Sequence, residues 1–240
     1  IVAAIAKAIA DASDAPASLP MRVMHPVDMR RYLASVGAER SIGDAIGLHR
    51  VSDPLALRSA VALVVDAETS EVLYAKNTEF VLPIASLTKL MTAMVVLDAH
   101  LPLDEMLSVD ISQTPEMKGI YSRVHLNSQI SRRNMLLLAL MSSENRAASA
   151  LARTYPGGTP AAIAAMNRKA VAIGMTSSHF YDGTSLNSGN SASPRDLVTM
   201  VKAAHTYPLI RRFSTTSEHA VAIKDRIQQF HNTNYLVKNP

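Results

Sequence analysis

An apolar run at residues 84–97 constrains most strongly how this chain can fold. The run reads Ile-Ala-Ser-Leu-Thr-Lys-Leu-Met-Thr-Ala-Met-Val-Val-Leu, so apolar side chains would lie on nearly every side of a helix. A helix that is apolar all round is buried in a core rather than laid on a surface. Pro83 precedes the run and suits a helix start, since an N–H there would have no helical partner. The sequence therefore predicts a core helix around which other elements pack.

Ser86 and Lys89 are the two residues that do not fit this helix. They are three positions apart, so their side chains project from the same face. A lysine in the first turn is unfavourable because the positive end of the helix dipole attracts acids, and a capping box would place Glu or Gln there. A serine hydroxyl becomes a nucleophile when an adjacent base takes its proton, and a lysine whose pKa is lowered by burial can be that base. The alternative is a serine N-cap followed by an exposed lysine, and the tetrapeptide alone does not decide between the two.

Length and composition indicate a globular chain with a substantial core. Its 240 residues, 48% hydrophobic and 18% charged, suffice for one large domain or two small ones. The net charge of +4 is small and the basic doublets are scattered without interleaved aromatic residues, so no nucleic-acid partner is expected. The absence of cysteine excludes disulfides and thiolate metal sites. No run reaches the length of a transmembrane helix.

The pattern divides the chain into a peripheral segment, residues 1–57, and a globular domain, residues 58–240. The first segment has an alanine-rich start, a linker-like stretch and a mixed stretch interrupted by three glycines, so a tether with some short helix is predicted. Two strand-length runs open the domain at residues 60–66 and 71–76, with a turn between them. They predict an antiparallel hairpin that leads into the core helix.

Helical patterns dominate the middle of the domain. Ser131 is the predicted N-cap of a helix that runs to Met141, and a second apolar helix follows at 146–152. Between them lies a polar tetrad, residues 142–145, which is either a second N-cap or a site.

Two more helices are expected towards the end of the chain. Thr159 as N-cap predicts a helix over residues 161–173, and a second begins at Pro194 and runs to about Thr206. The polar residues 213–240 are expected to be irregular.

Two other kinds of hydrolase site lack their motifs. No Gly-x-Ser-x-Gly occurs, which argues against a Ser-His-Asp hydrolase. The eight histidines include no His-Glu-x-x-His pair, which argues against a zinc peptidase, and no metal ligand is predicted.

Two motifs of the chain resemble those of the low-molecular-mass penicillin-binding proteins, the serine DD-peptidases. They are Pro-Ile-Ala-Ser-Leu-Thr-Lys-Leu-Met-Thr at residues 83–92 and Met-Ser-Ser-Glu-Asn-Arg-Ala-Ala at residues 141–148. The likeness covers about residues 53–237 and is greatest to the D-alanyl-D-alanine endopeptidases of the penicillin-binding protein seven type. It implies an α+β, DD-peptidase/β-lactamase-like fold, with an antiparallel sheet flanked by helices plus a mainly helical subdomain.

The resemblance also implies a role for each motif residue. Ser86 would be the nucleophile that attacks a D-alanyl carbonyl, and Lys89 would be the base that accepts its proton. Ser143 would relay a proton towards the leaving amine, and Asn145 would hold the substrate peptide by its side-chain amide. The backbone N–H of Ser86 would form half of an oxyanion hole. No cofactor is implied.

The implied activity is cleavage of D-alanyl peptide bonds of peptidoglycan through an acyl-Ser86 intermediate, with endopeptidase action on cross-links favoured over carboxypeptidase action. Peptidoglycan stem peptides would be the substrates and β-lactam antibiotics covalent inhibitors. The implied compartment is the periplasm, with a signal peptide removed. The alternative is an inactive or truncated homologue that serves as a cell-wall binding or scaffold protein.

The chain departs from the family pattern in two places. The third motif of the family, Lys-Thr-Gly or Lys-Ser-Gly, does not occur, so we expect a chain cut short before it. The loop at residues 182–187 reads Asp-Gly-Thr-Ser-Leu-Asn where acid-Pro-Thr-Gly-Leu is usual, with Gly183 replacing Pro and Ser185 replacing Gly. This change is expected to affect the conformation of the loop without touching the catalytic groups.

Overall fold

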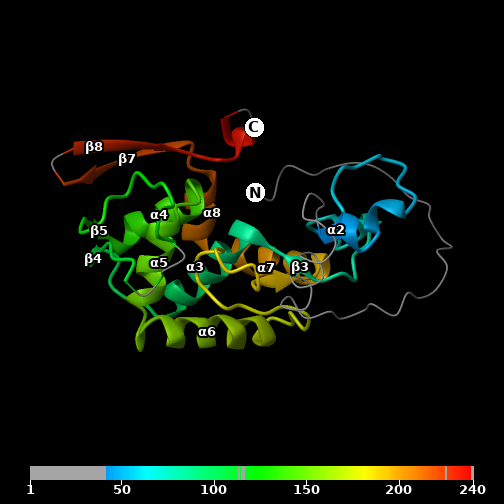
Figure 1. Ribbon diagram of the computed structural model, residues 1–240, viewed down its shortest axis with the longest axis horizontal. Coiled ribbons are helices and arrows are strands. Elements are labelled where there is room, and N and C mark those ends of the chain that lie inside the picture. Colours follow the sequence, from blue (N-terminus) through cyan, green and yellow to red (C-terminus); the bar gives the residue numbers. More distant parts are fainter. Residues whose placement is uncertain (1–41, 113, 115–116, 225, 239–240) are drawn as a thin grey trace.

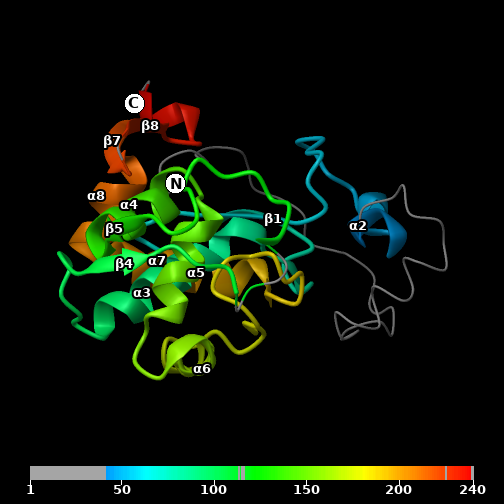
Figure 2. The same cartoon turned by 60° about the vertical axis from the view of Figure 1, so that its left-hand side comes forward.

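The computed structural model describes residues 42–112, 114, 117–224 and 226–238, and these combine helices with short antiparallel strands (Figures 1 and 2). The predicted α+β class is confirmed. Most of the predicted tether, residues 1–41, lies outside the described residues. The helices are α2 (Ile42–Ala45), α3 (Thr88–Asp98), α4 (Arg132–Met141), α5 (Asn145–Arg153), α6 (Gly158–Ala172), α7 (Pro194–His205) and α8 (Pro208–Thr215), with short 3-10 helices η1 (Leu48–Arg50), η2 (Ala85–Leu87) and η4 (Tyr235–Lys238).

Helix α3 is the core element that the apolar run predicts. Residues 88–96 are all buried, and the helix packs against α4, α5, α6, α7 and α8. Figure 1 shows it in teal among these helices, with α6 running below it. The burial of this helix on all sides follows from its lack of a polar face.

The start of this helix differs from the prediction. Pro83 is not at the helix start but in strand β3 (Leu82–Pro83), which pairs with β6 (Ser191–Ala192). Ile84 continues this pairing by donating its N–H to the carbonyl of Asn190. Because strand pairing uses the backbone as far as Ile84, the chain turns only afterwards, through η2, into α3.

The predicted N-terminal hairpin is confirmed as β1 (Ala62–Val65) and β2 (Val72–Lys76), paired antiparallel. The turn between them is held by the Asp66 carboxylate, which accepts hydrogen bonds from the N–H groups of Glu68 and Thr69. Further two-stranded antiparallel sheets pair β3 with β6, β4 (Met106–Ser108) with β5 (Gln129–Ser131), and β7 (Glu218–Ile223) with β8 (Arg226–His231). In the described residues, antiparallel pairing is therefore divided among small sheets around the helices.

Residues just before the hairpin are bound to it. The buried Lys76 ammonium donates to the Asp53 carboxylate over 2.8 Å, and the Tyr74 hydroxyl donates to the same carboxylate over 2.5 Å. Both contacts lower the pKa of Asp53. The boundary predicted between residues 57 and 58 stays a prediction.

Two of the predicted helix starts have different outcomes. The Ser131 hydroxyl accepts from the N–H of Asn134 and caps α4, as predicted. Helix α6 begins before Thr159, and its N-cap is Gly157 at φ +85°. The prediction of a Thr159 cap was wrong because glycine takes up the left-handed backbone there and lets the helix begin earlier.

The end of the chain is regular, contrary to the prediction for residues 213–240. Strands β7 and β8 form a hairpin that buries Val221, Ile223 and Phe230 and exposes alternate side chains. The buried Asn232 amide then donates to the carbonyls of Ser214 and Thr216. These bonds fix the chain that follows the hairpin against α8.

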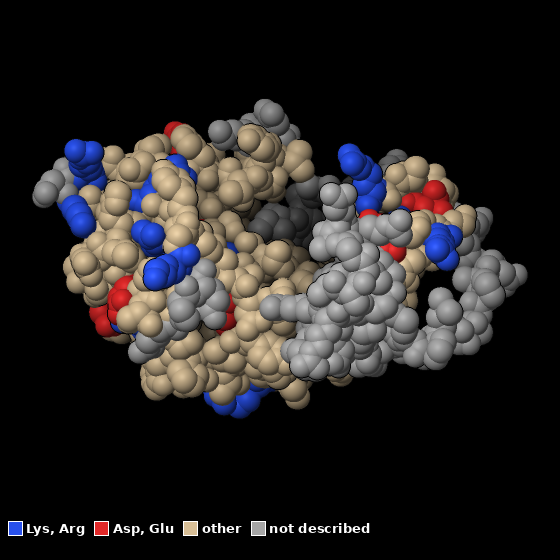
Figure 3. Space-filling model, in the orientation of Figure 1, with Lys and Arg blue, Asp and Glu red and all other residues tan. Residues whose placement is uncertain are grey.

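Charge and apolar length give two further observations on the described residues. None of their helices is both long and apolar enough to cross a lipid bilayer. On the face drawn in Figure 3, lysine and arginine side chains are separated by uncharged residues and form no continuous patch.

Candidate active site

Three serine hydroxyls surround the buried amine of Lys89. Its Nζ lies 3.0 Å from Ser86 Oγ, 3.4 Å from Ser143 Oγ and 3.3 Å from Ser185 Oγ. Ser143 also donates to Ser86 Oγ over 2.7 Å. The structure thus brings the predicted Ser86, Lys89 and Ser143 together and adds Ser185 to them.

Local backbone geometry places the first of these groups. Ser86 lies in the 3-10 turn η2, directly after Ala85 at φ +46°, and its side chain is exposed. Lys89 lies one turn further, inside α3, with 2% of its surface exposed. The result is a hydroxyl open to solvent next to an amine shielded from it.

Ser143 is placed by the junction between α4 and α5. Its backbone has φ +55°, a conformation that non-glycine residues adopt rarely and that is commonly found at functional sites. The Glu144 side chain follows it and caps α5 by accepting from the N–H of Arg146. The polar tetrad between the two helices is therefore both a cap, through Glu144, and part of the hydroxyl cluster, through Ser143.

Burial sets the electrostatics of the cluster. Loss of solvation lowers the pKa of Lys89 from 10.5 to about 8, while the carboxylates of Asp182 and Glu144 act in the opposite direction. An amine with a pKa of about 8 is uncharged in about one molecule in ten at pH 7, far more often than an ordinary lysine. It is therefore suited to accept the proton of an adjacent hydroxyl.

The cluster opens into a cavity of about 230 Å³. It is lined by Ile84, Ala85, Ser86, Leu87, Lys89, Leu90, Ala139, Leu140, Ser143 and Thr233. Thr233 reaches it because its N–H donates to the carbonyl of Met141. The segment that follows the β7–β8 hairpin thus contributes a residue to the wall of the cavity.

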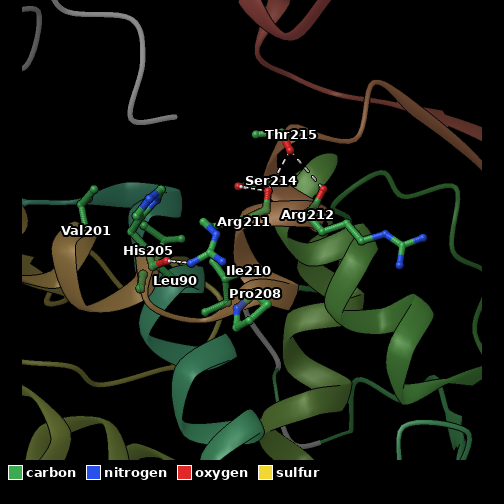
Figure 4. A pocket seen from close by; sticks show the side chains of 10 residues that line it. Leu90, Val201, His205, Pro208, Ile210, Arg211, Arg212, Ser214 and Thr215 are labelled. Atoms are coloured by element: carbon green, nitrogen blue, oxygen red, sulfur yellow. Dashed lines mark hydrogen bonds between the residues drawn. The ribbon is translucent and has the colours of Figure 1, made fainter. Parts of the chain in front are cut away.

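A larger pocket of about 480 Å³ lies beside this cavity, and Leu90 lines both (Figure 4). The hydroxyls of Ser214 and Thr215 in its wall donate to backbone carbonyls of their own helix. The Arg211 side chain likewise donates to the carbonyl of His205. These hydroxyls are engaged locally, whereas Ser86 Oγ lies 3.0 Å from the buried Lys89 amine, so the smaller cavity is the candidate site.

Asn145, predicted to bind substrate, lies outside the set of described residues that line the cavity. It is the first residue of α5, and it is not among the described residues that line the Ser86 cavity. Its Oδ1 atom is buried and has no hydrogen-bond partner in the part of the chain that the structure describes. Its role in substrate binding stays a prediction.

Ser185 is the functional candidate that sequence reasoning missed. Besides its contact with Lys89, its hydroxyl lies 3.5 Å from Ser86 Oγ. The expectation that the altered loop leaves the catalytic groups untouched was therefore wrong. The signal was present in the sequence, because a serine replaced the usual glycine beside the predicted site.

A serine hydroxyl within hydrogen-bond distance of a buried amine is the geometry of a Ser-Lys hydrolase. The sequence matches the peptidase S11 family, described as D-alanyl-D-alanine carboxypeptidase, over residues 48–240. The chain therefore belongs to this family of serine peptidases.

Individual relatives and structures agree with this assignment. The chain is 55% identical to a D-alanyl-D-alanine endopeptidase of Escherichia coli K12, covering 75% of this chain and 59% of that protein. It is 54% identical to a D-alanyl-D-alanine endopeptidase of Pseudomonas aeruginosa, covering 76% and 60%. The chain thus spans about three fifths of the length of these curated relatives.

The crystal structure of the Streptomyces K15 DD-transpeptidase superposes with a TM-score of 0.67 at 26% identity, covering 74% of each chain. This likeness confirms the predicted DD-peptidase-like fold.

Replacing Lys89 with Met tests the burial of the amine. Below a pH of about 8 the folded protein carries a buried charge that a Met side chain avoids, so Lys89→Met should increase the free energy of unfolding by about 1–3 kcal/mol at pH 6. The gain should shrink as pH rises from about 8 towards 10.5, where folded Lys89 is neutral and its unfolded counterpart still charged. Urea unfolding at several pH values measures it.

The exposed Lys118 supplies the control, since Lys118→Met should not change the stability in this pH-dependent way. A Lys89→Met variant less stable than the native chain at pH 6 would contradict the assignment of a buried amine whose charged form is destabilised.

Proposed function

We propose that this chain, with residues 58–240 as its peptidase domain, is a serine DD-peptidase that cleaves D-alanyl peptide bonds of peptidoglycan. The observation that carries the proposal is the contact of Ser86 Oγ with the buried Lys89 amine over 3.0 Å. Membership of the D-alanyl-D-alanine carboxypeptidase family supports the choice of substrate class. Relatives named as D-alanyl-D-alanine endopeptidases favour cross-links over free stem-peptide ends.

The proposed reaction begins with transfer of the Ser86 hydroxyl proton to the uncharged amine of Lys89. Ser86 Oγ then forms a bond to the D-alanyl carbonyl carbon, and backbone N–H groups at the start of the helix, that of Ser86 among them, stabilise the oxyanion. Collapse of the tetrahedral intermediate breaks the peptide bond.

Release of the leaving group needs a proton on its nitrogen. Ser143 contacts both Ser86 and Lys89, so its hydroxyl can pass the proton from the Lys89 ammonium to the leaving amine. Water then hydrolyses the acyl-Ser86 ester and restores the enzyme. Asn145 is proposed to hold the substrate peptide by its side-chain amide.

The proposed substrate also determines the proposed compartment and the expected inhibitor. Peptidoglycan lies outside the cytoplasmic membrane, so the proposed compartment is the periplasm. A β-lactam presents a strained amide to the same serine and would leave a stable acyl-enzyme.

Acylation by penicillin tests the nucleophile. Intact-mass spectrometry of the full protein should show one added penicilloyl group, and peptide mapping should place it on Ser86. Ser86→Ala should abolish the adduct while its circular dichroism spectrum stays native, because the exposed hydroxyl carries little of the fold. An adduct that persists in Ser86→Ala would refute the assignment, and a folded native protein without adduct would favour the cell-wall binding role.

Cross-linked and uncross-linked substrates separate the two peptidase activities. With purified muropeptides, a dimer joined through a D-alanyl cross-link should be cleaved faster than the terminal D-Ala is released from a pentapeptide monomer. Chromatography of the products measures both rates, with Ser86→Ala as the blank. Faster release from the monomer would assign carboxypeptidase activity instead.

The pKa of Lys89 sets the expected pH dependence of acylation. Because the neutral amine is the base, the acylation rate constant should rise with pH, with a midpoint at about 8, and then level off. Removing the Glu144 charge in Glu144→Gln should move the midpoint to lower pH, since that carboxylate raises the pKa of Lys89. Stopped-flow labelling with a fluorescent penicillin measures the profile, and a flat profile between pH 6 and 10 would exclude Lys89 as the base.

A further inference from the structure

The backbone of Ser185 is held in a conformation that favours glycine. Its φ is +102°, where a side chain crowds the neighbouring carbonyl groups. Such a residue persists only when its surroundings determine the conformation, and it is a reason to look for function.

The surroundings of Ser185 do determine its conformation. The Asp182 carboxylate accepts from the N–H groups of Thr184, Ser185 and Asn187. The side-chain amide of Asn190 donates to the same carboxylate. This turn directs the Ser185 hydroxyl at the Lys89 amine.

The orientation of the Lys89 amine depends on its three hydrogen-bonding positions. A neutral amine carries two N–H donors and one lone pair, and the base step requires that the lone pair faces Ser86. Ser143 and Ser185 lie 3.4 and 3.3 Å from Nζ, so each can accept one N–H. With only one of these acceptors present, rotation about the terminal C–N bond would let an N–H face Ser86 instead.

We propose that Ser185 is a positioning residue whose hydroxyl accepts a hydrogen bond from Lys89 and thereby turns the amine lone pair towards Ser86. The inference rests on the proposed function, because it concerns the orientation of the base in that reaction. Ser185 itself forms no bond to substrate in this role.

Two variants separate the hydroxyl from the backbone strain. Ser185→Ala and Ser185→Gly both remove the acceptor, but only glycine relaxes at positive φ. The melting temperature of Ser185→Gly should therefore exceed that of Ser185→Ala by about 2–4 °C.

Ser70 provides a matched control outside the hydroxyl cluster. It also has positive φ, at +64°, and its hydroxyl also accepts from a lysine, Lys202, over 2.6 Å. It lies exposed in the turn of the β1–β2 hairpin. Ser70→Gly therefore repeats the chemical change of Ser185→Gly away from the amine cluster.

The experiment measures penicillin acylation of the full protein by stopped flow, with the acylation rate constant and the preceding dissociation constant separated by varying penicillin concentration. Both Ser185 variants should lower the rate constant about five- to tenfold, the effect of one hydrogen bond, and leave the dissociation constant unchanged. Ser70→Gly should change neither.

Three results would overturn the inference. Native rates in both Ser185 variants, or a loss confined to Ser185→Ala, would show that the hydroxyl is not needed. A changed dissociation constant with a native rate constant would assign Ser185 to penicillin binding instead. Absence of acylation in the native protein would refute the proposed function together with this inference. The other two results concern only the Ser185 variants and leave acylation of the native protein intact.

Discussion

The desolvation of one amine is the constraint on which this structure depends. Lys89 lies inside the first turn of a helix that five other helices cover, and this packing keeps water from its side chain. Burial destabilises the charged form of the amine and thereby lowers its pKa to about 8. A surface lysine at the same spacing from Ser86 would stay protonated at neutral pH and could not accept its proton.

The hydroxyls around that amine come from three separate segments of the chain. Ser86 comes from η2, Ser143 from the junction of α4 and α5, and Ser185 from the loop that follows α6. Two of the three have positive φ, and Ala85 beside the third does too. Three of the nine non-glycine residues with positive φ in the described part of the chain therefore lie at or beside the hydroxyl cluster. At Ser185 the conformation is held by hydrogen bonds of its loop.

Features that depend on the local sequence pattern were predicted, whereas features that depend on contacts between distant segments of the chain were missed. The burial of the all-apolar helix and the Ser131 cap follow from local pattern, and both were found, although the helix begins later than predicted. The Ser86–Lys89 contact was expected from spacing together with the family resemblance, and the two side chains do meet. The β7–β8 hairpin was missed because its few apolar residues form no clear alternating pattern. Burial of those residues against other elements stabilises the two strands. The Ser185 contact was missed because 96 positions separate it from Lys89, and no local period reports such a distance.

The small size of the reactive cavity limits how a substrate can approach it. A volume of about 230 Å³ is below the several hundred that enclose drug-sized ligands, so in the proposed reaction a peptide would place only its reacting end against Ser86. The rest of the peptide would then lie on the surface outside the cavity, whose wall includes Thr233. In the proposed reaction, reactivity is therefore set by the buried amine and its hydroxyls, whereas the choice between a free stem-peptide end and a cross-link would be made by surfaces beyond the cavity.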